Sequence, residues 1–246
     1  ERLFQVIERL AENGPMGIMD LSAELGFHKS TTHRLVTSLQ YMGYIRQDEE
    51  SLKYALSLKF LEIGSKILEQ TNMASLIHPS LKKLSEQTGE TVHLVRREGT
   101  EAVYIDKVES TVSSIRMVSR VGSRIPLYCS GVGKALLAEL PDPEIEDIWN
   151  SSEITSLTPY TVTSLSDLMD RIRGVREAGY AMDDEENEEG VRCIAVSIPD
   201  YHKEPVYALS ISAPVSRMTD ARIAELSTDV LTFKKDLEKT LGFSRS

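Results

Sequence analysis

The 246-residue sequence is 41% hydrophobic and carries a formal net charge of −10 at pH 7. The apolar content argues against a disordered chain, and the length suits two domains of ordinary size. No stretch approaches the run of about 18 apolar residues that a membrane-spanning helix needs, and two cysteines, Cys129 and Cys193, cannot form a disulfide framework.

The first 13 residues predict an amphipathic helix. Their apolar side chains recur at helical spacing, at Leu3, Val6, Ile7 and Leu10. A signal peptide would instead show a continuous apolar stretch and a cleavage site, so we expect a cytoplasmic protein. Because the sequence starts at Glu1 rather than Met, we also expect that the natural chain has been trimmed.

Two further short helices and a hairpin follow. Residues 18–25 form the next predicted helix, with Gly26 as its C-terminal cap, and residues 30–42 form the third. Residues 44–45 and 53–56 predict two strands around a polar turn. This order of helices, short turn and hairpin is typical of a winged helix-turn-helix, which we assign to residues 1–56.

The acidity of the chain is not shared by this N-terminal part. Residues 1–60 contain seven Lys and Arg against eight Asp and Glu, so they carry only −1 of the net charge. Residues 26–45 contain Lys29, Arg34 and two histidines but no carboxylate. The overall charge therefore does not argue against nucleic-acid binding by this part of the chain.

The first turn of the third helix carries most of the candidate DNA contacts. In a helix-turn-helix these residues face bases and phosphates in the major groove. Hydroxyls and the N–H groups of a helix N-terminus suit phosphate oxygens, whereas a carboxylate would meet like charge. The candidates are Lys29, Ser30, Thr31, Thr32, His33, Arg34 and Thr37, together with Arg46 on the hairpin.

A plainer interpretation of this turn is a helix cap with a solvated basic face. The hairpin directly after the helix favours the DNA-binding interpretation. Three acids at the tip of the hairpin, Asp48, Glu49 and Glu50, do not suit a wing inserted deeply into DNA. We therefore expect the wing to contribute only modestly to binding.

The remaining chain predicts a linker helix and a second domain. Residues 57–73 form the linker helix, whose apolar side is expected to pack on another surface, such as a second subunit. Residues 74–246 mix strands, among them one over 113–120, with helices that include one at the C-terminal end. Antiparallel hairpins with outer helices indicate an α+β sensor domain rather than a doubly wound fold.

The sequence resembles the IclR family of bacterial transcription regulators along nearly its whole length. The segments that carry the resemblance are GIMDLSAELGFHKSTTHRLVTSLQYMGYI, YALSLKFLEIG, RIPLYCSGVGKALLA, GYAMDDEENEEGVRCIAV and YALSISAPVSRMT. Within the family it is most similar to the KdgR branch, whose members govern pectin and hexuronate catabolism and sense 2-keto-3-deoxygluconate. The resemblance implies a repressor that binds a palindromic operator. It also implies a homodimer formed through the first helix and the linker helix, often paired into a dimer-of-dimers tetramer.

By the same resemblance the second domain is GAF-like and binds a small carboxylate or sugar-acid effector. The ligand would lie beneath the start of a helix, beside two strands and against an apolar wall. The residues implied are Ile125, Ser130, Gly131, Val132, Asp183, Cys193, Ser210 and Ser212.

The chemistry of these residues suits such a ligand. The N–H groups of Gly131 and Gly133 at a helix start can hold a carboxylate. Ser210 and Ser212 are two apart on a strand, so they point to one face and can bond hydroxyl or keto oxygens. Asp183 would accept hydrogen bonds from ligand hydroxyls.

Each residue also has a plain structural interpretation. The two serines suit a solvated sheet face, and Cys193 suits a small core position. Asp183 belongs to the acidic run DDEENEE, which is typical of a solvated loop. Arg192 either balances this run or pairs with the carboxylate of the effector, and the sequence leaves both open.

The sequence does not match the motifs of known enzyme sites when these are compared residue by residue. SGVGKA resembles a phosphate-binding loop, but Tyr128 stands where the first Gly is needed and Ala135 where a Ser or Thr would hold the metal ion. The His and Cys residues are too scattered for a recognisable zinc pattern or an activated nucleophile. We therefore expect no enzymatic activity, cofactor or metal. The alternatives are a ligand-sensing protein-interaction module and, more remotely, an enzyme acting on a sugar acid.

Overall fold

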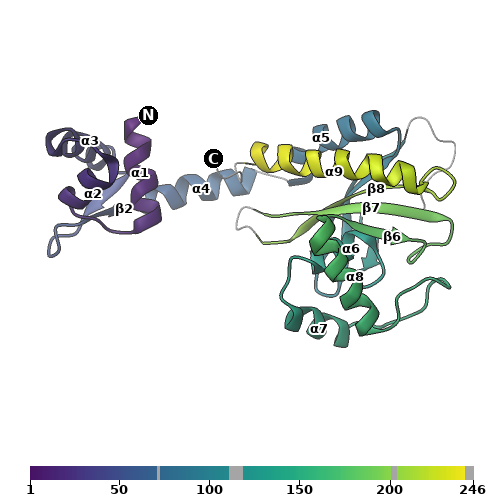
Figure 1. The fold of residues 1–246 in the computed structure, drawn as a ribbon. Helices are drawn as coiled ribbons and strands as arrows, with labels where there is room; N and C mark the ends of the chain where they lie inside the picture. Colours follow the sequence, from purple (N-terminus) through teal and green to yellow (C-terminus); the bar gives the residue numbers. More distant parts are fainter. Residues whose placement is uncertain (71–72, 111–118, 201–203, 242–246) are drawn as a thin grey trace. The chain divides into compact units, whose positions relative to one another are not determined.

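The computed structural model describes residues 1–70, 73–110, 119–200 and 204–241 (Figure 1). It divides into two compact units, residues 1–72 and residues 73–246. Within the described residues, no helix is both long and apolar enough to cross a membrane.

The first unit has the predicted order of three helices, a hairpin and a further helix. Its elements are α1 (Arg2–Asn13), α2 (Ile18–Leu25), α3 (Lys29–Tyr41), β1 (Ile45–Gln47), β2 (Tyr54–Leu56) and α4 (Lys59–Gln70). Gly26 ends α2 in the left-handed conformation, with a φ of 65°, which glycine adopts without strain. The apolar faces of the elements meet in one core, which includes Val6, Leu10, Leu21, Val36, Leu39 and Ile45.

The second unit is built on one six-stranded antiparallel sheet with the strand order β5-β4-β3-β8-β7-β6. The strands are β3 (Thr91–Glu98), β4 (Glu101–Val108), β5 (Arg124–Pro126), β6 (Ala181–Asp184), β7 (Val191–Ile198) and β8 (Tyr207–Pro214). The helices are α5 (Met73–Thr88), α6 (Gly131–Leu137), α7 (Asp142–Asn150), α8 (Leu165–Ala178) and α9 (Asp220–Thr240). Figure 1 shows α5 and α9 over one face of the sheet, and α6, α7 and α8 on the other.

The two faces of the sheet differ in character. On β8, Leu209 and Ile211 pack with α5 and α9, whereas Ala208 packs in the cluster that contains α6. Because side chains alternate along a strand, Ser210 and Ser212 lie on the same face as Ala208. The face of the sheet that α5 and α9 cover is therefore apolar, whereas the face that α6 covers carries buried polar groups.

The expected α+β architecture is confirmed, but two short strands are additional to the sequence prediction. Strand β5 has three residues, and β6 has four, of which the last two begin the acidic run that also allowed a solvated loop. Both are brief, and β6 carries two aspartates that disfavour a strand locally. Pairing of β6 with β7 overrides that preference, with Asp183 opposite Cys193. Most of the strand expected over 113–120 lies outside the described residues.

Candidate DNA interface and effector site

The start of α3 presents a basic, hydroxyl-bearing surface to solvent. Lys29, Ser30, His33 and Arg34 are exposed, and Thr31 is half-buried. The side chain of the N-cap residue, His28, makes no capping hydrogen bond, and the first turn of α3 contains no acidic residue. Its N–H groups and positive end of the helix dipole therefore favour an anion, as a DNA phosphate requires.

Thr32 does not belong to this surface, although the sequence predicted that it contacts DNA. It is 0% exposed, and its hydroxyl lies 3.4 Å from the carbonyl oxygen of His28. Thr32, Val36 and Leu39 follow one another at helical spacing on the buried face of α3. Thr37 is exposed one turn beyond the basic residues.

The hairpin carries a basic residue, Arg46, close to an acidic tip. Arg46 on β1 is exposed and lies opposite Ala55 of β2. At the tip, Asp48 accepts hydrogen bonds from the backbone N–H and the hydroxyl of Ser51, both of which hold the pKa of Asp48 below its ordinary value. Asp48 therefore stays ionised, and a tip with three acidic residues does not suit deep insertion beside phosphates.

The sheet brings the predicted effector residues of three strands into one row. Asp183 on β6 pairs with Cys193 on β7, which in turn pairs with Ser212 on β8. In the next row, Ala195 on β7 pairs with Ser210 on β8. Directly paired residues on antiparallel strands point to the same face, so these polar groups form one continuous patch beneath α6.

The start of α6 closes over this patch. A Cβ at Gly131 would lie 3.4 Å from the backbone N of Asp183 and 3.5 Å from the Cβ of Ala195, so the helix start and the strands are in direct contact. Ile125 and Val132 are 6% and 3% exposed and belong to the apolar cluster around the patch. The helix start, the polar row and the apolar wall are thus adjacent.

Two polar groups at this helix start are already used by the protein. The Ser130 hydroxyl donates to the carbonyl of Pro126 at 2.6 Å and accepts from the N–H of Gly133 at 3.1 Å. The idea that the Gly133 N–H holds a ligand carboxylate is therefore wrong, because Ser130 caps the helix with it. Glycine is required at 133 for another reason, since a Cβ there would overlap the backbone of Leu127.

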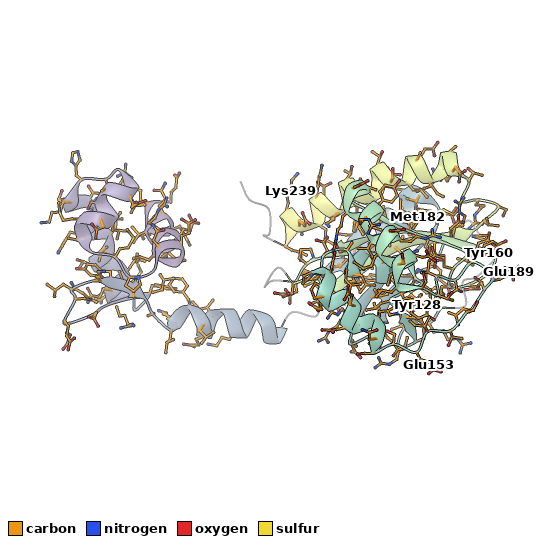
Figure 2. The ribbon with its side chains drawn as sticks, turned by 60° about the horizontal axis from the view of Figure 1, so that its bottom comes forward. Tyr128, Glu153, Tyr160, Met182, Glu189 and Lys239 are labelled. Carbon is orange, nitrogen blue, oxygen red and sulfur yellow. The ribbon has the colours of Figure 1, made fainter. Side chains whose placement is uncertain are left out.

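Asp183 is not part of a solvated loop. It is 4% exposed, and its Oδ1 accepts from the backbone N–H of Glu186 at 2.8 Å and of Asn187 at 3.4 Å. Burial raises the pKa of Asp183 to about 7, with Glu186 adding to the rise and Lys134 opposing it. Later in the acidic run Glu189 is exposed and lies at the periphery of the unit (Figure 2).

This raised pKa predicts that stability falls as pH rises towards 7. Between about pH 4 and 7 the folded protein keeps a proton on Asp183 that the unfolded chain releases, so folding is favoured at the acidic end of this window. From pH 5.5 to 7.5 the wild type should lose about 2 kcal/mol more unfolding free energy than Asp183→Asn, measured by urea denaturation. The comparison cancels His93, whose pKa is lowered to about 3 and which acts in the opposite direction. Equal pH dependence of both proteins would contradict the assignment.

A buried ion pair next to Asp183 was missed by sequence reasoning. Lys134 on α6 and Glu186 in the β6–β7 turn are each 1% exposed and form a salt bridge, and Arg171 of α8 lies 3.6 Å from the same carboxylate oxygen. The other oxygen, Glu186 Oε2, is buried and has no hydrogen-bond partner among the described residues. The signal in the sequence was Lys134 within the otherwise small and apolar segment SGVGKALLA.

Two further polar side chains on this face were also missed. His93 on β3 is 3% exposed and pairs with Ser210 across the strands. The ring of Tyr104 on β4 meets its ring edge-on, with 5.1 Å between the centroids. No local motif points to either residue, because only the register of the sheet places them beside the two serines.

The structure decides between the two roles that the sequence left open for Arg192. Its guanidinium pairs with Asp184 at 2.7 Å and with Asp220 at 3.0 Å, and it donates to the carbonyl of Met218 at 2.6 Å. Arg192 therefore balances the acidic run and ties β7 to the start of α9. It also follows from strand alternation that it points away from the face that carries Cys193.

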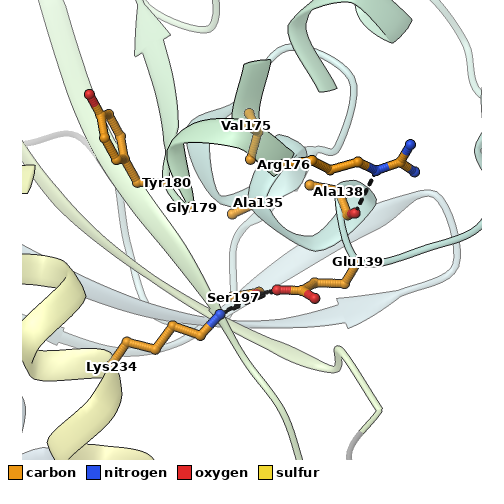
Figure 3. A pocket seen from close by; sticks show the side chains of 9 residues that line it. All are labelled: Ala135, Ala138, Glu139, Val175, Arg176, Gly179, Tyr180, Ser197 and Lys234. Carbon is orange, nitrogen blue, oxygen red and sulfur yellow. Dashed lines mark hydrogen bonds and ion pairs between the residues drawn. The ribbon is translucent and has the colours of Figure 1, made fainter. Parts of the chain in front are cut away.

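A separate pocket of about 160 Å³ lies near the end of α6 (Figure 3). Its charged groups satisfy one another, since Lys234 lies 3.3 Å from Glu139 and 3.1 Å from Ser197, which donates to Glu139. Arg176 at its rim donates to the carbonyl of Ala138. This arrangement joins α6, β7 and α9, so we assign it a structural role.

Comparison with known proteins supports the assignment of both units. The family model described as the IclR helix-turn-helix domain matches residues 1–49, and that of the bacterial transcriptional regulator IclR C-terminal domain matches residues 65–238. The chain belongs to the IclR family. It is thus a DNA-binding transcriptional regulator, and the IclR relatives that it matches are regulators rather than enzymes.

The relatives do not single out one branch of the IclR family. The chain is 35% identical to the transcriptional repressor IclR of Escherichia coli over 99% of this chain and 90% of that protein. It is also 35% identical to the regulator KdgR of the same organism, over 98% and 92%. The crystal structure of the Thermotoga maritima IclR has a TM-score of 0.66 and 32% identity, covering 98% of this chain and 97% of that one. Overall identity therefore does not distinguish the KdgR branch.

Proposed function

We propose that this IclR-family chain is a cytoplasmic repressor that binds a palindromic operator as a homodimer. A small carboxylate or sugar acid bound in the second unit would control its affinity for DNA. The observation that carries the proposal is the polar row of Asp183, Cys193 and Ser212, enclosed beneath the start of α6 in an otherwise apolar core. Buried polar groups gathered at one place are typical of a ligand site.

The first unit supplies the proposed means of DNA binding. Lys29, Ser30, His33 and Arg34 would contact phosphates and bases from α3, and Arg46 would contact the backbone from the hairpin. A dimer would place two copies of α3 on the two halves of a palindrome.

Exposed apolar side chains on α1, on α4 and just before α4 support dimer formation. Phe4 is 65% exposed, Leu58 81% and Leu61 66%. Large apolar side chains exposed on one small unit favour burial against a partner. A second copy of the chain is the partner that two operator half-sites require, and further pairing through the second units would give a tetramer.

The ligand would act by binding one arrangement of the DNA-binding units better than another. It can shift operator affinity only by the difference between its affinities for the two arrangements. 2-Keto-3-deoxygluconate, the effector implied by similarity to the KdgR branch, carries both the carboxylate and the hydroxyls that the polar row suits.

Replacing Lys29 and Arg34 together by Ala should weaken operator binding and reduce its salt dependence. Each phosphate contact that is lost lowers the slope of log K against log salt by about 0.9, so the double variant should lose roughly 2 units of slope. Binding is measured by fluorescence anisotropy on genomic operator fragments between about 50 and 200 mM salt, a range over which counterion release changes the affinity strongly.

The matched control removes two lysines from the other unit. Lys82 and Lys83 on α5 are exposed, so Lys82→Ala with Lys83→Ala makes the same change in net charge away from α3. This control should keep the wild-type slope. If the α3 double variant also keeps it, α3 does not contact DNA, and a protein partner becomes the better explanation of the winged helix.

A further inference from the structure

We propose that the β6–β7 turn, residues 185–190, is a lid over the polar row, and that the hydroxyls of Thr158 and Thr161 hold it closed. Opening of this lid would admit a small molecule from solvent. The inference rests on the proposed effector site and adds a route of entry to it. It does not depend on which acid the site binds.

The groups of the polar row are shielded from solvent. Asp183, Ser210 and Ser212 are each 4% exposed. The start of α6 lies directly on the row, since a Cβ at Gly131 would be 3.4 Å from the backbone N of Asp183. A ligand can therefore reach the row only after part of this cover moves. The part that moves most easily is the one with the fewest buried apolar contacts.

The β6–β7 turn has no apolar side chain to anchor it. Residues 183–190 are DDEENEEG, and none of them belongs to an apolar cluster of the structure. Helix α6, by contrast, buries Val132, Leu136 and Leu137 in the core of this unit. Glu189 lies in the turn at the periphery of the unit, where movement into solvent is unobstructed (Figure 2). Displacing the turn thus exposes far less apolar surface than displacing α6.

Two side-chain hydroxyls hold the turn against the neighbouring segment, residues 157–161. Thr158 donates to the carbonyl oxygen of Glu185 at 2.7 Å, and Thr161 donates to that of Glu186 at 2.6 Å. These are bonds from a side chain to the backbone rather than part of a strand ladder. They can break while the pairing of the sheet stays intact, so the turn can open locally.

The closed turn also contains two unfavourable features. Glu185 has a φ of 61°, in the left-handed region that a residue with a side chain rarely adopts. Glu186 Oε2 is buried and has no hydrogen-bond partner among the described residues, although Oε1 pairs with Lys134. Opening would relieve the backbone at Glu185 and let water reach Oε2. The ion pair with Lys134 and the two threonine hydroxyls oppose opening, so together they set how often the turn opens.

The thiol of Cys193 reports opening without any effector. Cys193 lies opposite Asp183 in the row, and burial raises the pKa of its thiol, so it reacts slowly while the turn is closed. We expect methyl methanethiosulfonate to label Cys193 of the full-length protein faster than global unfolding allows. Thr158→Val with Thr161→Val should label it at least about tenfold faster, because opening then breaks two fewer bonds. Mass spectrometry of peptides separates Cys193 from Cys129.

The matched control removes two buried hydroxyls from the other side of the sheet. Ser85 and Thr88 on α5 each donate to a backbone carbonyl at 2.8 Å, as the two threonines of the lid do at similar distances. Ser85→Ala with Thr88→Val should lower the unfolding free energy, measured by urea denaturation, about as much as the lid variant does. It should leave the labelling rate of Cys193 within about twofold of the wild type, because opening of the lid does not break these bonds.

A labelling rate of Cys193 that is unchanged in the lid variant, or raised equally by the control, would overturn the inference. So would labelling of wild-type Cys193 as fast as an exposed thiol, because the row would then need no opening. If the double variant does not fold, Thr158→Val alone provides the test, since Thr161 also accepts from the backbone N–H groups of Leu157 and Thr158. The expected acceleration in a protein that binds no acid would support the lid and count against the proposed effector alone.

Discussion

Gly133→Ala should destabilise the second unit by about 3 kcal/mol or more in unfolding free energy. A Cβ at this position would overlap backbone atoms of Leu127, which is 0% exposed. A flexible side chain could move aside, but buried backbone cannot do so without displacing the strand and helix that it joins. Urea denaturation followed by circular dichroism measures the loss.

A second helical glycine provides the matched control. Gly174 in α8 is exposed, and a Cβ there would meet nothing within 4 Å. Gly174→Ala should therefore be neutral or stabilise the protein by up to about 1 kcal/mol, because alanine loses less backbone entropy in a helix. Similar stabilities for the two variants would show that the start of α6 tolerates displacement and that its contact with the sheet is not rigid.

Lys134→Met should destabilise the protein by about 3–5 kcal/mol, because it leaves the buried carboxylate of Glu186 without its principal partner. Both side chains are 1% exposed, so water cannot replace the lost ammonium group. The loss should also raise the pKa of Asp183, since Lys134 is the charge that opposes its rise. Denaturation at pH 7 and NMR titration of the carboxyl measure the two effects.

Two further variants separate this effect from a general effect of losing lysine. Lys134→Met combined with Glu186→Leu should recover much of the lost stability, because no buried charge then remains unpaired. Lys82 and Glu86 on α5 form an exposed pair at 3.9 Å, and Lys82→Met should change stability by less than about 0.5 kcal/mol. If Lys134→Met lowers the unfolding free energy as little as Lys82→Met does, the ion pair of Lys134 and Glu186 is not shielded from water.

The first unit was predicted closely because its signals are local. The spacing of Val36 and Leu39 and the cap at Gly26 lie within one helix or next to its end, so the sequence is enough to place them. The error at Thr32 has the same origin. A hydroxyl at a helix start suits phosphate, but helical spacing aligns Thr32 with Val36 on the buried side, and that alignment was given too little weight.

The site in the second unit was only half predictable. The resemblance placed Asp183 and Ser210 together, and the register of the sheet does put both side chains on the same face. His93 could not be placed in the same way, because its partner Ser210 is 117 residues away along the chain and only the register of β3 with β8 joins them. The sequence left open whether the acidic run is a solvated loop or contributes to the site, and pairing with β7 and the ion pair of Glu186 bury two of its carboxylates.

Strand β3 serves both layers of the second unit. His93 lies on the face that carries the polar patch, whereas Val92 and Leu94 pack on the other face among residues of α5. Because one strand carries both sets of side chains, any displacement of His93 would also displace Val92, Leu94 and the helix that packs on them. Helix α5 is the first element after α4 in the chain. One strand therefore joins the polar patch on one face of the sheet to α5, the first helix of the second unit, on the other.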